Sequence, residues 1–201
     1  MKTVSNQPYY EAKSGGDNPE GFFARPVARF LDFYLNGHIT DSKDYIQWNQ
    51  EIRQAGENDL ITIHINCYGG DIMTTIQLIR AMSDTKATVV ASVEGACMSA
   101  ATFVFLAANV CEVSEHSQFM IHNYSSGSWG KGNELIAKAI ATDNWANNLM
   151  RKTYQHFLTD KEIEDVIAGK DIWMEQKEVI QRLEKRNKKM KRKPPVASVT
   201  N

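Results

Sequence analysis

The sequence predicts an α/β fold with a mainly parallel sheet. Short β-branched runs alternate with segments of helical period along most of the 201 residues, and this order is typical of parallel strands joined by helices. Residues 60–66 place isoleucine at every second position, as a strand with one buried face requires. From Ile72 to Met82 the apolar residues instead recur at helical spacing. With 42% hydrophobic residues, the chain can bury one core, and we expect one domain at 27–180.

Turn signals and apolar runs predict the elements up to residue 108. Residues 30–35 are expected to form the first strand, which Asn36 and Gly37 end. N-cap candidates at 40–42 begin a helix that extends to about residue 55. The β-branched run at 87–93 predicts a buried strand, and the apolar residues 100–108 predict a helix.

In the second half, short strands are expected at 111–113 and 118–121. Residues 123–132 are too rich in glycine for a core strand and favour an exposed hairpin or sheet edge, which can pair with an extended peptide. A helix from about 133 to 157 is longer than the average globular helix and is expected to project. A helix at 160–167, with Gly169 as its C-cap, precedes residues 171–174, which return toward the core.

Charge limits the classes of partner. The formal net charge is −1 and the sequence pI is about 6.5, so no whole-molecule field favours nucleic acid or an anionic membrane. Residues 182–193 carry net +7 and leave net −8 for the rest of the chain. We expect 181–201 to be a basic, disordered tail that serves solubility, docks an acidic partner or RNA, or is cleaved in maturation. Residues 1–26 are expected to be flexible.

The cysteines and the apolar runs indicate the compartment. Cys67, Cys97 and Cys111 have no metal-ligand spacing and are expected to act as small apolar residues in a reducing compartment. The sequence therefore predicts neither a metal nor a cofactor. The first residues lack an apolar run of signal-peptide length, and no run approaches the roughly 18 residues of a membrane span. A soluble, cytoplasmic protein is expected.

Ser99 stands where the expected strand turns into the expected helix, within Gly-Ala-Cys-Met-Ser-Ala-Ala at 95–101. At such a turn the unpaired amides of the helix start face the hydroxyl, and small neighbours let a substrate backbone approach. The alternative is a small residue packed in an alanine-rich helix. Gly69, Gly70 and His122 also follow expected strands, and ligands of parallel sheets collect at the carboxyl ends of strands.

Four segments in this order resemble the proteolytic subunit of the Clp protease family, over residues 30–176. They are Asn-Cys-Tyr-Gly-Gly at 66–70, Gly-Ala-Cys-Met-Ser-Ala at 95–100, Met-Ile-His at 120–122 and Lys-Asp-Ile-Trp-Met at 170–174. The resemblance implies the ββα-superhelix, or crotonase-like, fold with a projecting long helix. It also implies a serine endopeptidase of the ATP-dependent type.

The resemblance assigns a role to each matching residue. Ser99 matches the nucleophile, His122 the general base, and Asp171 the acid that orients the imidazole. The backbone amides of Gly70 and Ala100 match the oxyanion hole. The resemblance further implies that an added strand of peptide is held by the following residues: Gly69, Asn123, Tyr124, Ser125, Ser126 and Gly127.

Each assignment has an alternative. His122 can be a core histidine, and Asp160 and Asp165 compete with Asp171 unless they are solvated or capping residues. His38, His64, His116 and His156 share no metal spacing and are expected to be structural.

The chain also departs from the family pattern. Cys67 and Tyr68 stand where the family usually has Ser-Pro, so the oxyanion loop loses a rigid φ. Residues 179–193 are expected to form an exposed helix that fades into disorder, where the family closes with a strand. The family's N-terminal segment, which engages an AAA+ unfoldase, has no counterpart in residues 1–26. This difference argues against such an ATPase as a partner.

The resemblance implies homo-oligomers, in which heptameric rings stack in pairs through the helix at 133–157 and enclose the sites. Peptides or unfolded proteins are the expected substrates. Three alternatives remain open: a non-catalytic ring or scaffold subunit, an acyl-CoA enzyme of the same fold, and a maturation protease that works without an unfoldase.

Overall fold

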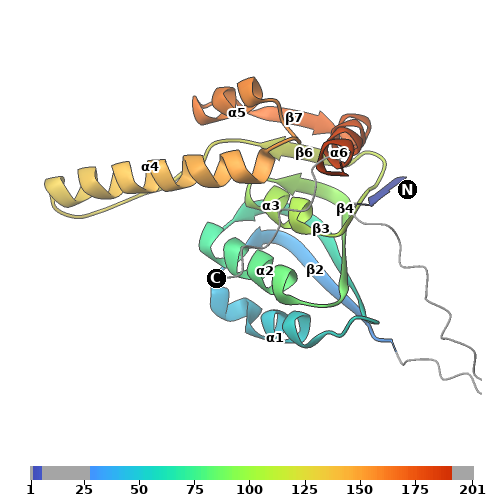
Figure 1. Cartoon of the computed structure of the whole chain (residues 1–201). Helices are drawn as coiled ribbons and strands as arrows, with labels where there is room; N and C mark the ends of the chain where they lie inside the picture. The colour runs from blue at the N-terminus through green and yellow to red at the C-terminus, as the bar shows by residue number, and fades with distance from the viewer. Residues whose placement is uncertain (1, 6–27, 192–201) are drawn as a thin grey trace, which may run out of the picture. The chain divides into compact units, whose positions relative to one another are not determined.

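The computed structural model describes residues 2–5 and 28–191 (Figure 1). The chain divides into two compact units, Met1–Ser117 and Gln118–Asn201, which we call the first and the second unit. None of the described helices is both long enough and apolar enough to cross a membrane.

The first unit is built on a mainly parallel sheet. Four strands run parallel in the order β5 (Val110–Val113), β4 (Thr88–Met98), β3 (Leu60–Gly70) and β2 (Phe30–Ile39). β1 (Lys2–Ser5) pairs antiparallel with the outer side of β5. The expected α/β class with a mainly parallel sheet is therefore confirmed.

Helices follow the central strands and cover one face of this sheet (Figure 1). They are the 3₁₀ turn η1 (Ser42–Tyr45), α1 (Ile46–Gln54), α2 (Ile72–Asp84) and α3 (Ala100–Ala107). The alternating isoleucines of β3 are buried, whereas Thr62 and His64 on the opposite side are half-buried. α3 is buried on every side from Ala100 to Leu106, as a helix without a polar face must be. This packing fixes the position of the α3 N-terminus.

The described part of the second unit, residues 118–191, contains an antiparallel strand pair and three helices. β6 (Gln118–Ile121) pairs with β7 (Ile172–Glu175). The long helix α4 (Gly132–Tyr154) contacts α5 (Asp160–Ile167), and α6 (Gln176–Lys191) contacts both strands. The expected long helix is confirmed, although its first fourteen residues, 132–145, contain no buried side chain.

Four expectations about local structure were wrong. β2 does not end at Asn36 and Gly37, because Gly37 takes a φ of +70° and the register with β3 shifts between Gly37 and Ile39. β3 and β4 likewise extend to Gly70 and Met98. The structure assigns no strand to residues 122–131, all of which it describes, so the expected hairpin or sheet edge is not formed.

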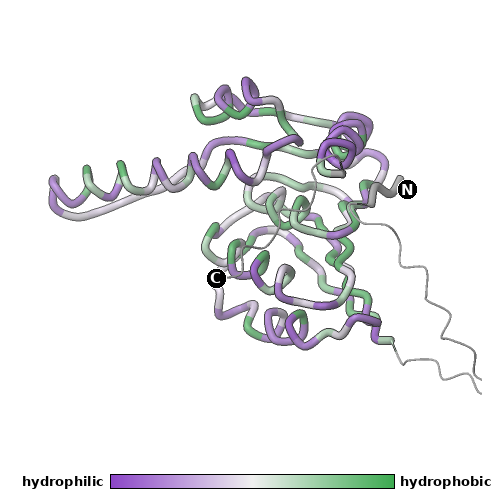
Figure 2. Tube along the Cα trace, in the orientation of Figure 1, coloured by the Kyte–Doolittle hydropathy of each residue, from purple (hydrophilic) through white to green (hydrophobic). Residues whose placement is uncertain are grey.

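The C-terminal helix also differs from expectation. α6 is mostly hydrophilic (Figure 2), but Val179, Ile180 and Leu183 are buried, so one face packs against the unit instead of being fully exposed. The expected tail begins inside this helix, since residues 181–191 are helical. Residues 192–201, and residues 1–26 apart from β1, lie outside the described part of the chain.

Candidate active site

Ser99 occupies the sharp turn between β4 and α3. Its backbone has φ 54° and ψ −127°, a conformation that L-residues rarely adopt. The Ser99 carbonyl accepts hydrogen bonds from the N–H of Thr102, at 3.0 Å, and from the Thr102 hydroxyl, at 2.6 Å. The strand, strained serine and helix together form the geometry of a nucleophile elbow, which exposes a serine hydroxyl beside the amides of a helix start.

Gly69 lies directly against this elbow. Its φ is +96°, and a Cβ at this position would lie 2.5 Å from Ser99 Cβ and 3.0 Å from the backbone N of Ala100. Real Cβ atoms do not approach other atoms so closely, so only glycine lets the end of β3 reach the elbow. The structure therefore brings Gly69, Ser99 and Ala100 together within the first unit.

Gly70 is held by the neighbouring strand. It pairs with Ile39 of β2, and a Cβ on Gly70 would collide with the Ile39 carbonyl oxygen. The next residue, Asp71, donates its N–H to Ile39 O at 2.9 Å and caps α2 by accepting the N–H of Thr74 at 2.7 Å. The loop is therefore fixed on the β2 side and at the start of α2.

Asn66 is a residue of this region to which the sequence analysis gave no role. Its Oδ1 accepts the backbone N–H of Ala96 at 3.0 Å, and a Cβ on Gly95 would lie 2.6 Å from the same oxygen. The amide thus ties the end of β3 to the part of β4 that leads into Ser99. The only signal in the sequence is a polar side chain at the end of an apolar strand.

His122 and Asp171 lie at the same end of the β6–β7 pair in the second unit. Ile121 and Ile172 are register partners in this antiparallel pair, so His122, which follows Ile121, and Asp171, which precedes Ile172, are neighbours across it. His122 is half-buried and Asp171 is exposed.

The residue after His122 has a structural contact of its own. Asn123 Nδ2 donates to the carbonyl of Ile167 at 2.9 Å, at the C-terminal end of α5. Asn123 Oδ1 accepts the N–H of Tyr124 at 2.8 Å. The Asn123 side chain therefore anchors the segment after His122 to the helix that leads to Asp171.

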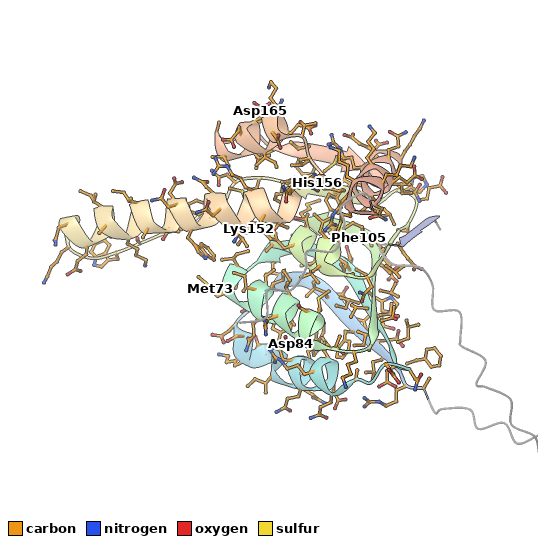
Figure 3. All side chains as sticks on the ribbon, viewed as in Figure 1. Met73, Asp84, Phe105, Lys152, His156 and Asp165 are labelled. Atoms are coloured by element: carbon orange, nitrogen blue, oxygen red, sulfur yellow. The ribbon has the colours of Figure 1, made fainter. Side chains whose placement is uncertain are left out.

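Asp165 and Asp160, the alternatives to Asp171 as the acid that orients the imidazole, have other roles in the structure. Asp165 lies on α5 (Figure 3) and pairs with Lys161 at 2.8 Å and with Lys170 at 3.7 Å. Hydrogen bonds from Lys161 are the main reason that the pKa of Asp165 is lowered. Asp160 begins the same helix, where a carboxylate interacts favourably with the helix dipole.

The structure assigns no strand to residues 123–131, the segment expected to bind peptide. Tyr124 is half-buried, with its hydroxyl 3.5 Å from Asp143 Oδ1, whereas Ser125, Ser126 and Gly127 are exposed.

Comparison with known proteins agrees with this arrangement of elements. The family model described as Clp protease matches residues 41–182 of the chain, which is more than half of its length and includes every residue from Gly69 to Asp171. No curated protein matches the chain.

Proposed function

This chain belongs to the Clp protease family, and we propose that it is a serine endopeptidase whose nucleophile is Ser99. The observation that carries the proposal is the close approach of Gly69 to the strained Ser99 elbow. Nothing in the packing of an ordinary alanine-rich helix requires a serine with positive φ against a glycine. A strained residue and a close backbone approach at one place are typical of functional sites.

In the proposed reaction, Ser99 Oγ attacks the peptide carbonyl while His122 removes its proton. Asp171 holds the imidazole and stabilises the imidazolium. The N–H groups of Gly70 and Ala100 donate to the oxyanion of the tetrahedral intermediate. His122 then protonates the amine as its bond to the carbonyl carbon breaks. Water next attacks the carbonyl carbon of the Ser99 ester while His122 takes its proton, and His122 returns this proton to Ser99 Oγ as the acid product leaves.

The residues proposed for this chemistry belong to both units. The proposed nucleophile and oxyanion donors are residues of the first unit, and the proposed base and acid are residues of the second. The placement of Ser99 at the start of a buried helix supports the first part. The register that sets His122 beside Asp171 supports the second.

We propose further that the protein works as a homo-oligomer of heptameric rings, which stack in pairs through α4 and admit peptides or unfolded chains. Exposed apolar side chains on α4, Ile136 and Ile140, support assembly through this helix. Whether an AAA+ unfoldase delivers the substrate is a separate question, answered by activity on folded and unfolded proteins with and without ATP.

Labelling with a serine-reactive fluorophosphonate tests the proposal. We expect the wild-type protein to be labelled at Ser99 and to cleave peptides. In Ser99→Ala, labelling should be lost and turnover should fall by roughly 10⁶, as in other triad enzymes. Folded wild-type protein that stays unlabelled would identify a non-catalytic ring subunit. Turnover of acyl-CoA thioesters that survives in Ser99→Ala would instead indicate an acyl-CoA enzyme.

A further inference from the structure

The thiol of Cys67 lies under the loop that carries the proposed oxyanion donor. Cys67 is buried near the end of β3, where it is the register partner of Gly37 on one side and of Cys97 on the other. From the sequence alone, Cys67 is expected to be only a small apolar residue. In the structure its sulfur is a hydrogen-bonding group.

Two hydrogen bonds join this thiol to Gly69. The N–H of Gly69 donates to Cys67 Sγ at 3.4 Å, and the thiol donates to the Gly69 carbonyl at 3.7 Å. Burial raises the pKa of Cys67, although backbone hydrogen bonds from Gly69 and Ile39 oppose the rise. The sulfur therefore stays protonated and keeps the hydrogen that it donates.

The second of these bonds acts on the same peptide unit that Ile39 of β2 holds through its pairing with Gly70. The Gly69 carbonyl and the Gly70 N–H belong to one peptide unit, and the described chain contains no cis peptide bond. In a trans unit the C=O and the N–H point in opposite directions. A thiol that holds the carbonyl on its own side therefore directs the Gly70 N–H to the other side.

Other contacts also limit the orientations open to the Gly69–Gly70 peptide unit. Both glycines have positive φ, +96° and +145°, so without a restraint their backbone could rotate through conformations closed to other residues. Gly69 is already pressed against Ser99 and Ala100. The thiol and the pairing of Gly70 with Ile39 together hold the loop in one of the orientations that glycine allows.

We propose that Cys67 is a positioning residue, whose thiol orients the Gly69–Gly70 peptide so that the Gly70 N–H is available to the oxyanion. The proposal rests on the proposed function of Ser99 and adds the group that holds the oxyanion loop. Cys67 contacts neither substrate nor reacting atoms, and its effect is transmitted through Gly69.

Substitutions at Cys67 in the full chain distinguish the hydrogen-bonding role of the thiol from its contribution to core packing. Cys67→Ser keeps a donor and an acceptor, whereas Cys67→Ala and Cys67→Val keep neither. Cys111→Ala is the matched control, because Cys111 is another buried thiol of the same sheet and donates to Phe105 O at 3.3 Å. For each variant, kcat and KM on a fluorogenic peptide, the rate of fluorophosphonate labelling and thermal unfolding are measured.

We expect Cys67→Ala to lower kcat and the labelling rate at least about tenfold, with KM nearly unchanged. The effect should stay below the 10² to 10³ typical of deleting an oxyanion donor. Cys67→Ser should recover most of the rate, and Cys111→Ala should lose stability without losing kcat. If Cys67→Ala does not fold, Cys67→Val is compared with Cys67→Ser in its place.

Two results would overturn the positioning role while leaving Ser99 as the proposed nucleophile. One is a folded Cys67→Ala or Cys67→Val variant with the kcat of the wild type, and the other is a Cys67→Ser variant that is as slow as Cys67→Ala. A wild-type protein that neither cleaves peptide nor reacts with fluorophosphonate would overturn the proposed function, and the role of Cys67 with it.

Discussion

His64 joins three strands of the first unit through two carboxylates. Its Nδ1 lies 2.6 Å from Glu94 Oε1 on β4, and its Nε2 lies 3.2 Å from Asp32 Oδ1 on β2. The imidazole also stacks on Tyr34, with ring centroids 4.6 Å apart. Partial burial disfavours the charged ring, but the hydrogen bonds to Glu94 and Asp32 outweigh burial and raise the pKa of His64.

This arrangement predicts a stability that depends on pH. A raised histidine pKa stabilises the fold fully below the unfolded value of 6.5, and the stabilisation is lost as the pH rises through the folded pKa. The melting temperature of the wild type should therefore exceed that of His64→Gln most in mildly acidic buffer and least in alkaline buffer. His38→Gln is the control, because His38 packs on the ring of Tyr68. A difference that does not change with pH would contradict the prediction.

For single residues, the sequence predicted which side chains are candidates for the site better than it predicted their hydrogen-bond partners. Ser99 could be singled out because a serine among small residues between a strand and a helix is a local pattern. The hydrogen bonds that Gly69 N–H donates to Cys67 and that Ala96 N–H donates to Asn66 could not be predicted, because they depend on the φ of Gly69 and on the register of β3 with β4. Neither is encoded within a few neighbouring residues.

Between elements, Arg182 joins α6 to α5. Its guanidinium donates to both oxygens of Glu162, at 2.7 and 3.0 Å, and to Glu178 at 2.7 Å. Glu162 also closes the capping box of α5 with Thr159. The hydrogen bonds from Arg182 are the largest cause that lowers the pKa of Glu162 to about 2. Fork-like pairing of this kind is stronger than a single contact.

Arg182→Met should lower the free energy of unfolding by about 2 kcal/mol, because it leaves two partly buried carboxylates without their cation. The loss should be full above pH 4.5, the ordinary pKa of Glu162, and should shrink as the pH falls toward 2 and that carboxylate becomes protonated. Urea unfolding over this range measures it. Arg80→Met removes an exposed pair with Asp84 and should cost less than about 0.5 kcal/mol. Equal losses of unfolding free energy in Arg182→Met and Arg80→Met would contradict the prediction that the Arg182 pairs contribute more to stability than the exposed Arg80 pair.

The order of the elements was predictable, but several of their boundaries were not. The alternating isoleucines of β3 and the helical spacing of α2 are strong local signals, and both elements formed. Residues 123–132 formed no strand because pairing needs a partner, and glycine and serine offer little side chain to bury. The buried stripe of α6 was missed because its lysines dominate the composition, while Val179 and Leu183 are sparse.

For the molecule as a whole, α4 carries the surface that the proposed assembly needs. The side chains of Ile136 and Ile140 are 65% and 59% exposed, and Trp129, just before the helix, is 100% exposed. Figure 2 shows hydrophobic turns along the part of α4 that has no buried side chain. Large apolar side chains gathered in this way are typical of protein interfaces.

The double variant Ile136→Glu and Ile140→Glu should therefore form smaller particles than the wild type, since charges in an apolar interface are costly to bury. Sedimentation velocity measures the particle size, and circular dichroism checks that helix content is kept. Lys138→Glu lies on the same stretch and changes charge without removing an apolar side chain, so its assembly should be unchanged. A double variant that assembles as the wild type would exclude α4 from the interface.

The strained turn at Ser99 has a consequence for how this protein can change over time. Glycine would adopt φ 54° and ψ −127° at little cost, so the position of the proposed nucleophile is one where glycine would suit the backbone better than serine. Selection for thermal stability alone would favour glycine at position 99, and the resulting proteins would be more stable but inactive. Under the proposed function, serine at this position gives up some stability in exchange for a reactive hydroxyl.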